Sequence, residues 1–156
     1  MSAHRYRCRV YYDDTDAGGI VYHANYLRFA ELGRTEALRE IGVPHAAMVE
    51  QHGLFFMVRR VKVDYLAPAR LDDSLIVETT TLAVAGASVE LRQDVLREAD
   101  GRLLARVEPQ LVCGRIADQR PARIPPRWRD AMRALMGADA KTIIDSAGPS
   151  SAVPPT

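Results

Sequence analysis

The chain has 156 residues, with 21 basic and 20 acidic side chains that leave a formal net charge of +1. A chain of this length fits a single globular domain, and the near balance of charges argues against a dedicated nucleic-acid binder. No apolar run approaches the roughly 20 residues that a membrane-spanning helix needs, and the N-terminus lacks the apolar segment of a secretory signal, so we expect a cytoplasmic protein without a membrane span.

The N-terminal part of the chain predicts a strand followed by a loop. Residues 6–12 alternate in polarity, which is typical of a strand with one buried face. Residues 13–19, DDTDAGG, then combine carboxylates with glycines, the composition of a turn that needs unusual backbone dihedral angles.

A long amphipathic helix is predicted next. Apolar and small residues recur at spacings of three and four from Tyr26 to Ile41, and small residues on this stripe would let the helix lie close to a sheet. We expect Asn25 to cap the start of the helix, Gly42 to end it and Pro44 to prevent its continuation.

The remainder of the core reads as strands after a short helical connection at residues 44–53. The predicted strands span residues 55–65, 74–83, 88–97 and 103–113. Short turns separate the last three, including the dipeptide Asp100-Gly101, which suits a type I′ turn, so an antiparallel meander is expected. Pro109 lacks a backbone donor and predicts a kink, a bulge or a local edge in its strand.

The C-terminal part predicts one more helix and a tail. Residues 127–136 place apolar side chains at helical spacing behind two prolines, which indicates a short docking helix. Residues 137–156 have too little apolar content to pack and are expected to be disordered. The interpretation is one domain over residues 1–136 with a disordered tail.

Cys8 and Cys113 are the two cysteines of the chain. They lie far apart in the sequence, and neither belongs to a Cys/His cluster with metal-ligand spacing. We therefore expect two reduced thiols that pack in the fold, rather than a zinc site or a disulfide.

One cluster of polar residues stands out, across the loop and the start of the helix. It comprises Asp13, Asp14, Asp16, Tyr22, His23 and Asn25. The first turn of a helix offers unpaired backbone donors and a partial positive charge, which suit a developing oxyanion. A nearby carboxylate can act as a general base toward water or attack directly, so acyl transfer to water is one hypothesis.

Other interpretations of this cluster remain open. Carboxylates before a helix commonly cap it, glycines commonly make turns, and a single histidine there can be a surface residue. A magnesium site at Asp14 and Asp16 has less support, because such sites draw ligands from several elements. The G-x-S-x-G motif of serine hydrolases, the P-loop and the dinucleotide fingerprint are absent from the sequence.

Two blocks of sequence point to a known family. Residues 11–29, YYDDTDAGGIVYHANYLRF, resemble the signature of hotdog-fold acyl-CoA thioesterases of the 4-hydroxybenzoyl-CoA thioesterase family, most closely the YbgC-type branch associated with the Tol-Pal system. Residues 63–73, VDYLAPARLDD, are similar to the same family. The resemblance covers about residues 6–113, followed by a familiar Arg-Ile-Pro exit at residues 123–125.

The resemblance implies an α+β hotdog fold, in which a five-stranded antiparallel sheet wraps around one long central helix. It also implies a homodimer with active sites at the subunit interface, and such dimers often associate into tetramers.

The resemblance further implies roles for individual residues. Asp16 matches the catalytic carboxylate, as general base or nucleophile, and His23 matches the residue whose backbone amide binds the thioester oxygen. Tyr22 and Asn25 would shape the acyl pocket. Residues expected to line that pocket from the opposite side of the interface are Phe56, Met57 and Val58. Candidates for the coenzyme A phosphates are Arg59, Arg60, Lys62 and Arg70.

The resulting hypothesis is hydrolysis of an acyl-CoA thioester to a carboxylic acid and free coenzyme A, without a metal or redox cofactor. Two alternatives stay open. The substrate could be an acyl group held by acyl carrier protein, whose acidic surface would meet the basic residues. The chain could instead be an interaction module of envelope or lipid-synthesis machinery with weak residual catalysis.

Overall fold

The structure is a computed structural model that describes residues 3–137. The disordered tail predicted for residues 137–156 therefore lies, except for Gly137, outside the described residues. The elements in chain order are β1 (His4–Arg9), the 3-10 turn η1 (Tyr12–Asp14), α1 (Asn25–Ile41), α2 (His45–His52), β2 (Leu54–Tyr65), β3 (Ser74–Val84), β4 (Ser88–Arg97), β5 (Leu103–Arg115) and α3 (Pro126–Ala134).

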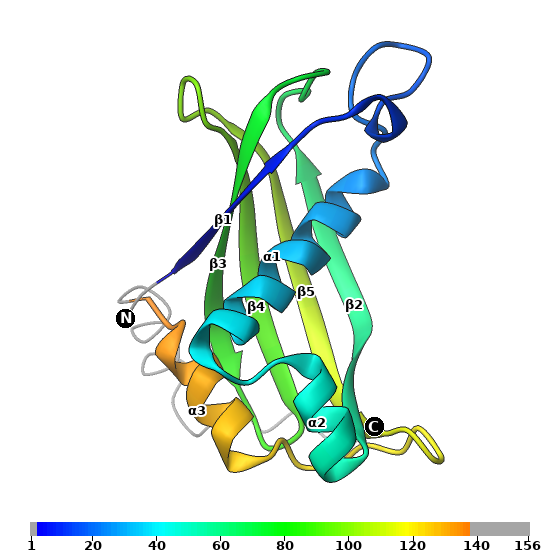
Figure 1. The fold of residues 1–156 in the computed structure, drawn as a ribbon, viewed down its shortest axis with the longest axis vertical. Helices are drawn as coiled ribbons and strands as arrows, with labels where there is room; N and C mark the ends of the chain where they lie inside the picture. The colour runs from blue at the N-terminus through cyan, green and yellow to red at the C-terminus, as the bar shows by residue number, and fades with distance from the viewer. Residues whose placement is uncertain (1–2, 138–156) are drawn as a thin grey trace, which may run out of the picture.

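The strands form one antiparallel sheet in the order β1-β3-β4-β5-β2, and α1 crosses its concave face (Figure 1). The predicted α+β architecture is confirmed, as is the meander of β3, β4 and β5. β1 and β2 are the two edge strands of the sheet. None of the described helices is long and apolar enough to cross a membrane.

Close packing of α1 on the sheet depends on its small residues, as predicted. A Cβ atom added to Gly33 would lie 2.5 Å from Cγ1 of Val77 on β3, well inside van der Waals contact. Only glycine leaves room for this approach. At its far end α1 stops at Gly42, which adopts a left-handed conformation with φ of 94°.

β1 is shorter than predicted. It ends at Arg9, opposite Ser74 at the start of β3, because the partner strand extends no further. Val10 then exchanges backbone hydrogen bonds with Asp72 and Asp73, and the chain turns into η1. The prediction that the strand reaches residue 12 is wrong, because alternation in sequence does not reveal where the neighbouring strand begins.

The β4–β5 turn also differs from its prediction. A type I′ turn needs a positive φ at both central residues, yet among the described turn residues only Gly101 has one, at 69°. The turn is instead a longer loop in which the Gly101 amide donates to the Arg97 carbonyl at 2.8 Å. The Asp100 carboxylate accepts from the Arg102 amide and the Arg97 guanidinium, which holds the loop closed and lowers the pKa of that carboxyl.

A bulge in β2 determines which side chains face the helix. The β2–β5 register shifts between Val58 and Arg60, so Arg59 is an extra residue in the strand. Val58, before the bulge, lies on the face of β2 that looks toward the helix. Regular alternation would turn Val61 and Tyr65 to the opposite face, but the extra residue places them on the same face as Val58. The sequence predicts an irregularity at Pro109. Toward β2, Pro109 pairs with Val61, just past the bulge. Toward β4, it lies between the Glu90–Gln110 and Gln93–Val107 pairs of the ladder.

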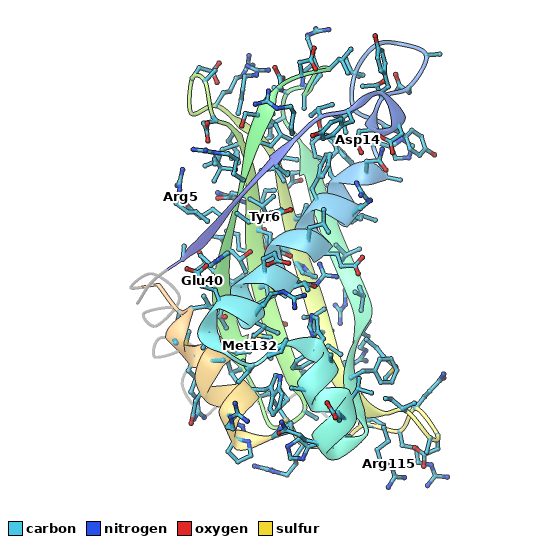
Figure 2. The ribbon with its side chains drawn as sticks, viewed as in Figure 1. Arg5, Tyr6, Asp14, Glu40, Arg115 and Met132 are labelled. Carbon is cyan, nitrogen blue, oxygen red and sulfur yellow. The ribbon has the colours of Figure 1, made fainter. Side chains whose placement is uncertain are left out.

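The apolar core consists of two clusters, one at each end of α1. The first surrounds the C-terminal end of α1 and contains Trp128 and Met132 of α3, which packs beside α2 (Figure 2). The second surrounds the N-terminal end and contains Tyr26 and Phe29 of the helix.

Both cysteines are free, and burial raises the pKa of the Cys8 thiol to about 11.

Candidate active site

Asp14 anchors the loop before α1 to the start of the helix (Figure 2). The residue is 4% exposed, and its carboxylate accepts from the Tyr11 amide at 2.9 Å and from Arg28 Nη1 at 3.3 Å. Its backbone carbonyl accepts from the Tyr22 amide at 2.9 Å and from Asn25 Nδ2 at 2.8 Å. This one residue therefore connects both strands of the loop with the first turn of α1.

Asp16 lies two residues further, at the tip of the same loop, and is exposed. The loop closes as a small antiparallel hairpin, in which Thr15 pairs with Val21 and the Asp16 amide donates to the Ile20 carbonyl. Oδ1 of Asp16 accepts from the Gly18 amide at 2.8 Å, and Gly19 has a φ of 78°. The two glycines thus allow the tight turn that the sequence predicted, and the carboxylate faces solvent on a fixed backbone.

The start of α1 presents free backbone donors. Within residues 3–137 neither a backbone nor a side-chain acceptor takes the amide hydrogens of His23 and Ala24. The peptide that carries the His23 amide is held in place, because the Tyr22 carbonyl accepts from the Asn25 amide at 2.8 Å. Such oriented, unpaired amides at a helix N-terminus can bind a carbonyl oxygen that gains negative charge.

Asn25 does not cap the helix as predicted. Ala24, with φ of −72° and ψ of −20°, is the N-cap residue and has helical geometry, so Asn25 already lies inside the helix. Its side chain donates to the Asp14 carbonyl instead of accepting from a helix amide. Asn25 therefore helps to anchor the loop rather than to cap the helix.

A cavity of about 360 Å³ opens beside His23. Its walls are mostly apolar, and its aromatic residues are Tyr26 and Tyr65, whose ring centroids are 5.6 Å apart. The Tyr26 hydroxyl accepts from the Ala69 amide at 3.0 Å, and burial raises the pKa of Tyr26. Tyr22 lies outside this cavity and packs its ring against that of His23, with centroids 4.6 Å apart.

The predicted pocket residues of β2 lie elsewhere in the single chain. Phe56 and Val58 line a second cavity, of about 350 Å³, together with Arg34 and His45. Val58 is seven and Phe56 nine residues along β2 from Tyr65, which corresponds to about 23–30 Å of strand. A single chain therefore does not bring Phe56, Met57, Val58 and Arg59 to Asp16 and His23.

The four cationic candidates for phosphate binding are all exposed. Arg60 Nη2 lies 3.4 Å from Gln110 Oε1, and Lys62 Nζ lies 3.9 Å from Asp64 Oδ2. Arg70 forms an isolated β-bridge with Ile20, which places its backbone beside the Asp16 loop, whereas Arg59 lies at the bulge. Of the four, only Arg70 adjoins the loop within one chain.

Sequence reasoning missed two residues of the site. Tyr65 stands in the second family-like block, and the spacing of apolar residues places Tyr26 on the buried stripe of the helix without indicating a role in the site. A regular alternation along β2 would not have placed Tyr65 and Val58 on one face, because the bulge between them cannot be seen in the pattern. The only available signal was a tyrosine at the end of a strand in a block shared with the family.

Comparisons with known proteins identify the family to which the chain is related. The family model of the thioesterase-like superfamily matches residues 10–132. The acyl-CoA thioesterase YbgC of Haemophilus influenzae is 38% identical over 127 residues, which cover 81% of this chain and 92% of that protein. The acyl-CoA thioester hydrolase YbgC of Escherichia coli is 40% identical over 121 residues, which cover 78% and 89%. The crystal structure of a probable thioesterase from Bartonella henselae superposes with a TM-score of 0.75 at 32% identity, covering 80% of this chain and all of that one.

Proposed function

Since the chain belongs to the thioesterase-like superfamily and is an acyl-CoA thioester hydrolase, we propose that Asp16 and the His23 amide act on the thioester carbonyl. The observation that carries this proposal is the pair of free amides at the start of α1, held next to the Asp16 loop by hydrogen bonds to Asp14. A carboxylate supplies a general base or nucleophile and a preorganised oxyanion site stabilises the charge that develops on the carbonyl oxygen, and both favour hydrolysis of a thioester.

The reaction has two chemical steps. Asp16 accepts a proton from water, whose oxygen adds to the carbonyl carbon, and the His23 amide binds the resulting oxyanion. Collapse of the tetrahedral intermediate breaks the carbon–sulfur bond, and the thiolate leaves and takes the proton. In the alternative route the Asp16 carboxylate attacks first, and water then hydrolyses the acyl-aspartyl anhydride. Both routes release a carboxylic acid and free coenzyme A.

We also propose that two copies of the chain complete the site. β2 is an edge strand whose unpaired backbone groups can bind a second copy, and exposed apolar side chains gather beside it, among them Val58, Tyr65 and Leu66 at 50–56% exposure. If two β2 strands pair antiparallel about their bulges, Phe56 of one copy lies opposite Lys62 of the other, three residues from Tyr65 instead of nine within one chain. This arrangement would bring Phe56 closer to the His23 end of the partner.

Substitution of Asp16 tests the assignment. Asp16→Asn keeps the size and the hydrogen bond from Gly18 but removes the base, so we expect kcat/KM on acyl-CoA to fall by about 10³-fold or more, at the scale of a lost general base, with an unchanged unfolding temperature. Asp13→Asn, on the exposed neighbour, is the matched control and should keep activity. Full activity of Asp16→Asn would disprove the assignment.

Isotope labelling separates the two routes. In a single turnover in H₂¹⁸O, direct attack by water puts ¹⁸O into the released acid and none into the enzyme. Attack by Asp16, followed by opening of the anhydride at the aspartyl carbon, puts ¹⁸O into the aspartate, and such label in Asp16 is diagnostic of the anhydride route. Mass spectrometry of the acid and of the peptide that contains Asp16 gives the answer.

The dimer is tested by light scattering together with activity. The Val58→Asp substitution places a charge on the proposed interface, so it should lower the molecular mass of the assembly in solution to that of a monomer and also lower kcat/KM. A monomer with full activity would show that each chain holds a complete site.

A further inference from the structure

We infer that Tyr65 is a positioning residue for catalysis, which holds the peptide after His23 so that the free amides at the start of α1 keep their direction. The inference rests on the proposed function. Tyr65 is the last residue of β2, and its hydroxyl donates to the His23 carbonyl oxygen at 2.9 Å.

The helix itself leaves this carbonyl available. His23 lies one residue before the N-cap Ala24, so its carbonyl is outside the hydrogen-bond ladder of α1. The Leu27 amide donates to the Ala24 carbonyl at 3.2 Å. Tyr65 thus supplies the hydrogen bond from a different element, 42 residues along the chain.

The contact completes the restraints around residue 23. The peptide before His23 is held because the Tyr22 carbonyl accepts from the Asn25 amide, and the peptide before that one is held because the Tyr22 amide donates to the Asp14 carbonyl. The peptide after His23 carries the Ala24 amide, and the hydroxyl of Tyr65 holds its carbonyl. With both peptides held, neither free amide can rotate toward solvent without breaking a hydrogen bond.

The Tyr65 ring is packed in a way that aims the hydroxyl. Its centroid lies 5.6 Å from the Tyr26 ring and 6.3 Å from the His23 ring, both in edge-to-face geometry. Tyr26 is itself anchored, because its hydroxyl accepts from the Ala69 amide. The bulge at Arg59 is the reason that Tyr65 faces the helix, because it changes the alternation of the strand.

A contribution of this kind should affect the chemical step more than binding. An oxyanion donor must point at the position that the charged oxygen occupies in the transition state, and loss of one such donor costs about 10²- to 10³-fold in kcat. Tyr65 acts on the direction of the donors rather than on their number, so its loss should cost less, on the order of tenfold, with little change in KM.

The experiment compares Tyr65→Phe with two reference variants. Phenylalanine keeps the ring contacts and removes only the hydroxyl. We expect kcat on an acyl-CoA, measured as released thiol per folded enzyme, to fall about tenfold while KM stays within about twofold. Tyr6→Phe, on β1 at the opposite edge of the sheet, is the matched control and should keep the wild-type kcat.

The outcomes separate this inference from the proposed function. If Asp16→Asn is inactive but Tyr65→Phe keeps the wild-type kcat, the positioning role is refuted and the proposed function stands. A rise in KM with unchanged kcat would also refute it, because Tyr65 would then act in binding. If Asp16→Asn is fully active, the proposed function fails, whatever the result for Tyr65.

Discussion

The two ends of α1 are held in different ways. Its C-terminal end is enclosed by α2, α3 and the sheet, in a cluster of large apolar side chains that includes Trp128 and Met132. At its N-terminal end a second apolar cluster, which includes Tyr26 and Phe29, packs the helix on the sheet. There, in addition, hydrogen bonds that involve Asp14, Asn25 and Tyr65 hold a loop that remains exposed. Apolar burial stabilises without strong directionality, whereas hydrogen bonds impose direction. Both ends therefore contribute stability, and the N-terminal end also provides the geometry of the site.

The largest effect on this comparison should come from Trp128→Ala. The Trp128 ring is fully buried and lies 5.5 Å from the His52 ring. We expect the free energy of unfolding in urea to fall by about 3–5 kcal/mol, while kcat per folded molecule stays the same because the site is at the other end of the helix. Trp128→Phe, which fills more of the space, should lose clearly less. A specific loss of kcat in the folded Trp128→Ala variant would contradict the separation of the two ends.

Gly33→Ala tests the close contact of α1 with β3, midway between the two ends of the helix. Alanine favours a helix over glycine by about 1 kcal/mol, but its Cβ would lie 2.5 Å from Val77. We expect a net destabilisation of about 1–3 kcal/mol from overpacking, measured by denaturant unfolding. In a Val77→Ala background the same substitution should cost less, because the clash is removed. An equal cost in both backgrounds would show that the close contact is not the cause.

Asp14→Asn should affect geometry as well as stability. The buried carboxylate has two donors, and an amide can accept only from one side, so we expect a loss of about 1–2 kcal/mol in unfolding free energy and a lower kcat. Arg28→Gln removes only an ion pair whose arginine is 58% exposed, and it should cost less than about 1 kcal/mol. If both variants lose the same kcat, the ion pair rather than the loop anchor is responsible.

The smallest effect concerns His45, at the cavity near the middle of α1. Burial, followed by the charge of Arg34, lowers the pKa of His45 below its ordinary value of 6.5. The unfolded chain therefore binds a proton more readily than the folded chain, so stability should decrease as the pH falls below about 6.5. His45→Gln should flatten this part of the curve of unfolding temperature against pH. If the curve of the His45→Gln variant follows that of the wild type between pH 7.5 and 5.5, the pH dependence belongs to other groups.

The helices and strands could be predicted because their patterns are local. The stripe from Tyr26 to Ile41 gave α1, and alternation with intervening turns gave the meander. The errors concern boundaries and turn geometry. The end of β1 depends on where β3 begins, and the β4–β5 loop depends on hydrogen bonds of Asp100 that compete with a type I′ turn.

The site could be predicted only in part for a related reason. Asp14, Asp16 and His23 lie within ten residues of one another, so a turn with two glycines is enough to gather them. The roles of Asp16 and His23 in catalysis remain predictions. Tyr65 comes from β2, at the edge of the sheet opposite β1, and no local pattern connects it with His23.

The sequence by itself determined the long helix, the strand-rich order, the glycine turn and the cluster of carboxylates before the helix, because spacing and residue type act over a few neighbouring residues. Only the tertiary structure decided which amides stay unpaired, which tyrosine reaches the helix N-terminus and where the first strand ends. These depend on register, on a bulge in an edge strand and on competition among hydrogen-bond partners that are distant in the chain.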